Sequence, residues 1–155
     1  NVECLRRTFE TEISTGRVIL YPKGVWDHER QLMLSLAPGG TGEHSLVIKY
    51  ANTRGSIMVD LTSIDTIVSE LKLARVDFIK MDIEGAERNA LAGARTTIAR
   101  FRPRMAISGY HLPDDTVVLP EVIRSIAVGY SMECGPCFLP HDRIVPETLF
   151  FRWSD

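Results

Sequence analysis

Several residue types and patterns that would mark a specialised class of protein are scarce in this chain. It has 155 residues, three cysteines and a formal net charge of −2. An odd cysteine count is a poor disulfide framework, and nucleic-acid-binding proteins usually show a basic face. No apolar run approaches the roughly 20 residues that span a bilayer, and no signal-peptide pattern opens the chain. We therefore expect a cytoplasmic protein with no membrane and no nucleic-acid partner.

The remaining composition is that of an ordinary globular protein, with 45% hydrophobic and 25% charged residues. The length allows one domain with a substantial core, so a single domain over residues 1–155 is predicted. The chain opens with Asn1 on a charged segment. We take this as a hint that it is part of a longer protein.

Two of the cysteines lie in the motif Cys134-Gly135-Pro136-Cys137, which is also the redox motif of thioredoxins. In that motif the first cysteine opens a helix whose N-terminus lowers the thiol pKa, but Pro140 disfavours a helix here. A zinc site made of Cys134, Cys137 and His141 lacks an obvious fourth ligand. A turn between two strands is therefore the favoured interpretation, and no metal site is predicted.

The first half of the chain predicts a short helix and then a largely antiparallel meander. The helix covers residues 2–12. Apolar runs separated by turn-forming residues predict strands at 17–21, 32–36, 45–50 and 56–61.

From about residue 61 onward, helical and strand patterns alternate. Thr62-x-x-Asp65 resembles a capping box. Gly85 is predicted to supply the backbone conformation of a strand-to-helix turn, before one helix that ends at Arg102-Pro103. Pro120 suits the first turn of a later helix. Strands are predicted at 76–81, 105–108, from 129 onward and at 148–153. This order predicts an α/β sheet with an antiparallel edge hairpin.

The most informative feature is the end of the strand at 76–81, where the apolar run gives way to acidic residues. By strand alternation, Lys80, Asp82 and Glu84 fall on one face, and His111 follows a neighbouring strand. Ligands of open α/β sheets bind outside the carboxyl ends of the strands. We therefore predict that Asp82, Glu84 and His111 line one cleft, with Lys80 as a further candidate catalytic residue. The alternatives are an Asp82–Lys80 pair, helix capping by the later acids and an ordinary loop histidine.

The stretch Asp82-Ile83-Glu84-Gly85-Ala86-Glu87 resembles the D-x-E-G-x-E signature of FkbM-type S-adenosylmethionine-dependent methyltransferases. Ordered pieces further along the chain extend the resemblance: Leu91-x-Gly93-Ala94, Arg102-Pro103, Ile107-Ser108-Gly109-Tyr110-His111, Leu119-Pro120, Gly129-Tyr130 and Glu147-Thr148-Leu149-Phe150. The resemblance implies a Rossmann-like class I methyltransferase sheet. It also implies methyl transfer from S-adenosylmethionine to an oxygen of a small molecule or glycan.

The resemblance further implies roles for individual residues. Asp82 falls beside the transferring methyl group, where a carboxylate can orient an acceptor hydroxyl or take its proton. Gly24-Val25-Trp26 falls where this fold places the adenine. Val25 and Trp26 are therefore candidate cofactor contacts together with Asp82, and a core position for the Trp26 ring is the alternative.

The chain also departs from the family pattern, because no G-x-G-x-G loop occurs in it. On the resemblance, residues 1–21 correspond to the helix after the second strand and then the third strand, so the first two strands are expected to be absent. This predicts a partial methyltransferase domain that binds S-adenosylmethionine weakly or not at all by itself. The alternative function is a non-catalytic truncated α/β fragment that self-associates as a homo-oligomer.

Overall fold

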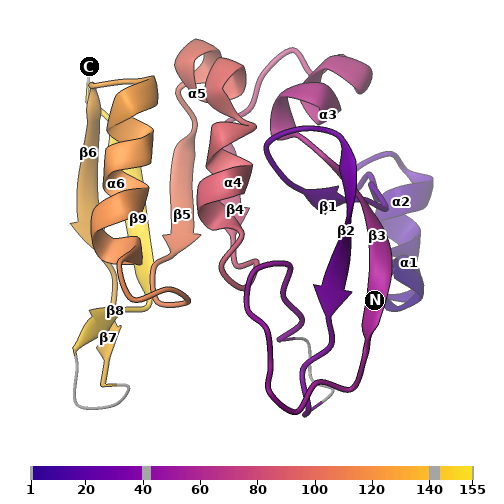
Figure 1. The fold of residues 1–155 in the computed structure, drawn as a ribbon. Helices are drawn as coiled ribbons and strands as arrows, with labels where there is room; N and C mark the ends of the chain where they lie inside the picture. The colour runs from indigo at the N-terminus through magenta and orange to yellow at the C-terminus, as the bar shows by residue number, and fades with distance from the viewer. Residues whose placement is uncertain (1, 40–42, 140–143, 155) are drawn as a thin grey trace.

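The computed structural model describes residues 2–39, 43–139 and 144–154, which form mixed sheets flanked by helices (Figure 1). The N-terminal part contains α1 (Val2–Thr8), α2 (Glu10–Ser14) and a three-stranded sheet in the order β1 (Gly24–Val25), β3 (Ser56–Thr62), β2 (Arg30–Ser35). Strand β2 is antiparallel to β3, as the predicted meander requires, and β1 is parallel to β3.

The C-terminal part contains a four-stranded sheet in the order β4 (Phe78–Met81), β5 (Arg104–Ser108), β9 (Thr148–Trp153), β6 (Tyr130–Cys134). Strands β4 and β5 are parallel, whereas β9 is antiparallel to both β5 and β6. A small ribbon of β7 (Cys137–Phe138) and β8 (Val145–Pro146) extends the link between β6 and β9. The predicted α/β character and antiparallel edge are therefore confirmed.

The four-stranded sheet buries one face under α4 (Glu87–Ala92), α5 (Arg95–Phe101) and α6 (Asp115–Ile126) (Figure 1). The core unites apolar side chains of these strands and helices: Ile79, Met81, Ala90, Leu91, Ala94, Ile98, Met105, Ile107, Leu119, Ile123, Tyr130, Leu149 and Phe151. Each large side chain buried there contributes about 1.5–3 kcal/mol. On the opposite face Phe78 and Phe150 stay 56% and 40% exposed. Within the described residues, β5 is the only strand that pairs with β4.

The helix predicted after Gly85 is two helices, α4 and α5, with Gly93 between them. A Cβ atom at Gly93 would lie 2.2 Å from the carbonyl oxygen of Trp26, so the chain passes here directly against the N-terminal part. The Asp65 carboxylate accepts hydrogen bonds from the backbone amides of Thr96 (2.9 Å) and Thr97 (2.8 Å), and it thereby caps α5.

The predicted capping box at Thr62 is wrong. The N-cap of α3 (Ile64–Glu70) is Ser63, whose hydroxyl accepts from the Thr66 amide at 3.0 Å. Asp65 lies in the first turn of α3 but is engaged with α5, because the two helices lie side by side. Pro120 lies inside α6 rather than in its first turn, where its ring is buried in the core.

Two predicted strands and one predicted helix also differ from the structure. Residues 17–21 form no strand. Residues 45–50 contribute only an isolated bridge between Ser45 and Ser35, because the Ser45 hydroxyl instead closes a turn by accepting from the amides of Val47 and Ile48. The helix at 2–12 is interrupted at Phe9, giving α1 and α2.

Cys134 ends β6 and Cys137 begins β7, so the predicted turn between two strands is confirmed. Both thiols are free and exposed. His141, the third member of the zinc site considered above, lies outside the described residues. None of the helices in the described ranges combines the length and the apolar character needed to cross a membrane.

Candidate active site

The carboxyl ends of β4 and β5 bring the predicted acidic residues and the histidine together. Because the strands are parallel, with Met81 paired with Ile107, the loops that follow them leave the same edge of the sheet. His111 Nε2 lies 3.5 Å from Asp82 Oδ1 and 3.5 Å from Glu84 Oε2. The predicted convergence of these three residues is confirmed, and their chemical roles remain predictions.

Glu87 holds the histidine in place from the first turn of α4. Its Oε1 accepts a hydrogen bond from the Ile83 amide (2.9 Å) and lies 3.0 Å from His111 Nδ1. The Glu87 side chain is buried, and the His111 side chain is only 4% exposed. A carboxylate at Nδ1 favours a proton on that nitrogen and turns Nε2 towards the other two acids.

The sequence presents Glu87 as part of the acidic signature and as a cap of the following helix, but does not pair it with His111, although a signal for its buried position exists. Glu87 falls on the helical face of Ala90 and Leu91, which pack in the core. A carboxylate on the apolar face of a helix needs a buried partner. That partner is His111, which comes from a loop distant in sequence.

The turn between β4 and α4 has an unusual backbone. Glu84 has φ 55°, in the left-handed region that side-chain-bearing residues rarely adopt, and Gly85 has φ 92°. The predicted conformational role of Gly85 is therefore confirmed. The Ser45 hydroxyl donates to the Glu84 carbonyl oxygen at 2.5 Å, which fixes the turn from the side of the N-terminal sheet. The strained conformation directs the Glu84 carboxylate back towards His111.

The pKa values of Asp82 and Glu84 are shifted in opposite directions by their surroundings. Burial raises the pKa of Asp82, but hydrogen bonds from Lys80 and Ser108 and the nearby positive charges outweigh burial and lower it overall. Burial and the negative charge of Asp82 raise the pKa of Glu84, although His111 opposes this. Asp82 is thus the more readily ionised acid, a division typical of paired catalytic carboxylates.

The two buried members of the cluster stabilise each other's charged form. Burial alone would lower the pKa of His111, yet the Glu87 hydrogen bond and the charges of Glu87, Glu84 and Asp82 raise it. Burial alone would raise the pKa of Glu87, yet the contacts with His111 and Ile83 lower it. The cluster therefore holds negative charge that calls for a cationic partner.

Two basic residues stabilise the cluster: Lys80 contacts Asp82 directly, and Arg88 stabilises the loop that carries His111. Lys80 Nζ lies 3.1 Å from Asp82 Oδ2, while the lysine side chain stays 61% exposed. Arg88 pairs with buried Asp115 at 2.6 Å and with Asp114 at 2.8 Å. Asp115 also accepts from the Leu112 amide at 2.7 Å, so this ion pair anchors the loop that carries His111.

Val25 ends β1 and Trp26 follows it, and Trp26 packs close to the acidic turn. Trp26 is 8% exposed and packs with Leu61 of β3 and with Ala86, which follows the acidic turn. Its amide donates to the Thr62 carbonyl at 2.7 Å. The buried ring supports the junction between the two sheets, and contact of Val25 or Trp26 with a cofactor remains a prediction.

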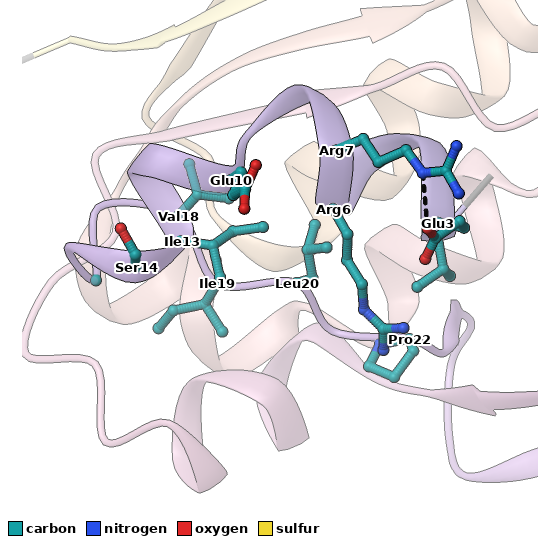
Figure 2. Close-up of a pocket in the computed structure, with 12 residues that line it drawn as sticks. Glu3, Arg6, Arg7, Glu10, Ile13, Ser14, Val18, Ile19, Leu20 and Pro22 are labelled. Carbon is teal, nitrogen blue, oxygen red and sulfur yellow. Dashed lines mark hydrogen bonds and ion pairs between the residues drawn. The ribbon is translucent and has the colours of Figure 1, made fainter.

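A separate groove of about 800 Å³ lies at the N-terminal helices (Figure 2). It is lined by α1, α2 and the segment from Val18 to Pro22, and Arg7 in its wall pairs with Glu3 at 2.7 Å. These elements are well separated from the loops after β4 and β5 (Figure 1). None of the predicted site residues lines this groove, so we assign the chemistry to the acidic cluster.

Comparisons with known proteins identify the family of this chain. A family model described as the methyltransferase FkbM domain matches residues 1–132. The 2-O-methyltransferase NoeI of Sinorhizobium fredii (strain NBRC 101917 / NGR234) is 30% identical over 98 residues, which cover 62% of this chain and 40% of NoeI. The crystal structure of methyltransferase FkbM from Methylobacillus flagellatus KT superposes with a TM-score of 0.64 at 25% identity.

That alignment covers 97% of this chain and 32% of the M. flagellatus protein, so the chain spans less than half the length of either relative. The family model, by contrast, matches most of the present chain and includes β4, α4, β5 and the whole acidic cluster. This chain belongs to the FkbM methyltransferase family.

Proposed function

We propose that this chain supplies the acceptor side of the active site of an S-adenosylmethionine-dependent O-methyltransferase. Family membership supports methyl transfer. The name of the relative NoeI, a 2-O-methyltransferase, supports an oxygen acceptor. The acceptor class is a hydroxyl of a small molecule or glycan. The observation that carries the proposal is the convergence of His111 on Asp82 and Glu84 at 3.5 Å, at the carboxyl ends of two parallel strands.

The proposed reaction is an in-line displacement. The bond between the methyl carbon and the sulfonium sulfur breaks as a bond to the acceptor oxygen forms, and the hydroxyl proton passes to a base. Ionised Asp82 accepts the hydrogen bond of the acceptor hydroxyl and orients one oxygen lone pair towards the methyl group. Lys80 and His111 flank Asp82 and hold its carboxylate in position.

On the cofactor side, Asp82, Val25 and Trp26 are the proposed contacts of S-adenosylmethionine. Half-buried Val25 ends β1, and its neighbour Trp26 packs against Ala86 behind the acidic turn. The segment and the turn therefore form one packed unit. A cofactor bound along that unit lies within reach of the acceptor held by Asp82.

Tritium transfer from methyl-labelled S-adenosylmethionine to a panel of mono- and oligosaccharides tests the proposal, with the cofactor at about 1 mM so that a weak site is still occupied. Asp82→Asn is expected to lower the transfer rate by about 100-fold or more, the usual range for loss of a general base. Asp77→Asn is the matched control, because Asp77 precedes β4 at its opposite end and its side chain pairs with exposed Arg75. Transfer that is equal in wild type and Asp82→Asn would contradict the assignment.

The alternative, a non-catalytic fragment that self-associates, predicts a different result. It predicts no tritium transfer to any acceptor and a sedimentation coefficient that rises with protein concentration. The exposed Phe78 and Phe150 on the uncovered sheet face are the apolar side chains that would drive such association.

A further inference from the structure

Three side-chain atoms of the acidic cluster that could each bind a metal ion lie close together. Atoms of Asp82, Glu84 and His111 all lie within 4.8 Å of one another. His111 Nε2 is buried and has no hydrogen-bond partner among the described residues. A buried polar atom without a partner is costly, and it calls for a specific explanation.

The Glu87 contact determines what Nε2 can do. With the Nδ1 proton directed at the Glu87 carboxylate, a neutral His111 has a lone pair on Nε2. That lone pair then faces two carboxylate oxygens, and three acceptors in contact repel one another. The arrangement is stable only if positive charge lies between them, either as a proton on Nε2 or as a bound cation.

The two separations from His111 Nε2 fit a bound ion better than a hydrogen bond. Hydrogen bonds between nitrogen and oxygen are usually about 2.7–3.2 Å long, and His111 Nε2 is 3.5 Å from each carboxylate oxygen. Two ligand atoms that each lie about 2.1 Å from one cation, at angles between octahedral and tetrahedral, are about 3.0–3.5 Å apart.

We infer that Asp82, Glu84 and His111 bind one divalent metal cation, with Glu87 as the carboxylate that orients the histidine ligand. Two carboxylates and one imidazole suit a cation of the Mn²⁺ or Mg²⁺ type, because oxygen ligands dominate. Metal-bound histidines commonly donate their second N–H to a carboxylate, which is the Glu87–His111 contact seen here.

The inferred role of the ion rests on the proposed function. Three protein ligands leave coordination positions for water and for the acceptor oxygen. A divalent cation there would lower the pKa of a coordinated hydroxyl and fix its position next to Asp82. The binding site itself depends only on the geometry of the cluster, so it can be tested without a cofactor or an acceptor.

Titration of the 155-residue chain with MnCl₂, followed by the electron paramagnetic resonance signal of free Mn²⁺, tests the inference. Wild type is expected to bind a single ion saturably. Glu84→Gln and Asp82→Asn are each expected to weaken binding about tenfold or more, whereas Asp77→Asn should bind as wild type does. Glu84 is a suitable target because its side chain is 23% exposed, so the variant should fold; circular dichroism checks this.

Three results would overturn the inference. The first is no saturable binding by the folded wild-type chain up to about 1 mM Mn²⁺, and the second is equal affinity in wild type, Glu84→Gln and Asp82→Asn. The third is weaker Mn²⁺ binding in the Asp77→Asn variant alone. The tritium assay separates this inference from the proposed function. Methyl transfer that persists in EDTA overturns the inferred role of the ion and leaves the proposed transferase intact, whereas saturable Mn²⁺ binding without methyl transfer supports the metal site and not the transferase.

Discussion

Replacement of Glu87 by alanine should destabilise the fold more than any change at an exposed acid of the site. The buried carboxylate accepts from the Ile83 amide at 2.9 Å and contacts His111 Nδ1 at 3.0 Å. Alanine leaves both donors buried without an acceptor and creates a small cavity. Removal of one partner of a buried charged pair typically costs about 3–5 kcal/mol, a large part of the roughly 5–15 kcal/mol that stabilises a domain.

Urea unfolding at neutral pH measures this cost. Glu87→Gln should lie between wild type and Glu87→Ala, because the amide oxygen can still accept from Ile83 but carries no charge for His111. Glu133→Ala is the matched control: Glu133 also forms an ion pair, with Arg152, but both side chains are more than half exposed. Loss of such an exposed pair should cost less than about 1 kcal/mol.

A loss below about 1 kcal/mol for Glu87→Ala would refute the claim that Glu87 is the buried anchor of the site. The same variants link the anchor to the inferred cation. Glu87→Gln should weaken Mn²⁺ binding about 10- to 100-fold, because the imidazole loses the carboxylate that sets its tautomer. Unchanged Mn²⁺ affinity in Glu87→Gln would show that the histidine orients itself without Glu87.

Four further outcomes are expected. Gly93→Ala should destabilise the chain by about 3 kcal/mol in urea unfolding, because its Cβ would lie 2.2 Å from the Trp26 carbonyl oxygen. Burial raises the pKa of Asp65, but hydrogen bonds from Thr97 and Thr96 outweigh burial and lower the pKa overall. The stabilisation of the fold by ionised Asp65 is therefore fully present above the ordinary pKa of an aspartate, and it is lost as the pH falls through the lowered pKa of the folded state. The stability difference between wild type and Asp65→Asn should accordingly shrink on acidification below about pH 4 in a urea series. Calorimetry should find S-adenosylmethionine binding to this chain weaker than micromolar, and a micromolar dissociation constant would contradict the predicted loss of cofactor contacts. The thiols of the Cys134–Cys137 motif should react with a disulfide reagent no faster than an exposed free cysteine does; a fast thiol would revive the redox interpretation.

The sequence predicted the second half of the fold well because its signals are local. The run at β4 ends in acids, a helical face follows, and the order of elements requires a parallel pair with an antiparallel edge. The convergence of Asp82, Glu84 and His111 followed from one rule, that parallel strands end at the same edge. No knowledge of side-chain positions was needed for that prediction.

Three of the failures share a physical cause, which is a long-range contact that outweighs a local pattern. Residues 45–50 have strand-like composition, but the Ser45 hydroxyl closes a turn there and also holds Glu84. Asp65 matches a capping box for its own helix, yet it caps α5. One apolar face predicted a continuous helix after Gly85, yet Gly93 divides it where Trp26 packs close. A single sequence contains no local signal for such partners.

The cluster at the β4–α4 turn is difficult to explain as a device for stability. Glu84 occupies a left-handed conformation that glycine would adopt with less strain, and Glu87 and His111 are charged groups placed where apolar side chains would pack without desolvation cost. Among the residues that the structure describes, none forms a hydrogen bond with His111 Nε2. Each feature costs free energy in the isolated fold, and together they present two carboxylates and one nitrogen to a common point. Backbone strain and unpaired polar groups that occur together at the carboxyl ends of parallel strands are typical of a binding site. Binding of a ligand there offsets the free energy that the strain and the unpaired groups cost the fold.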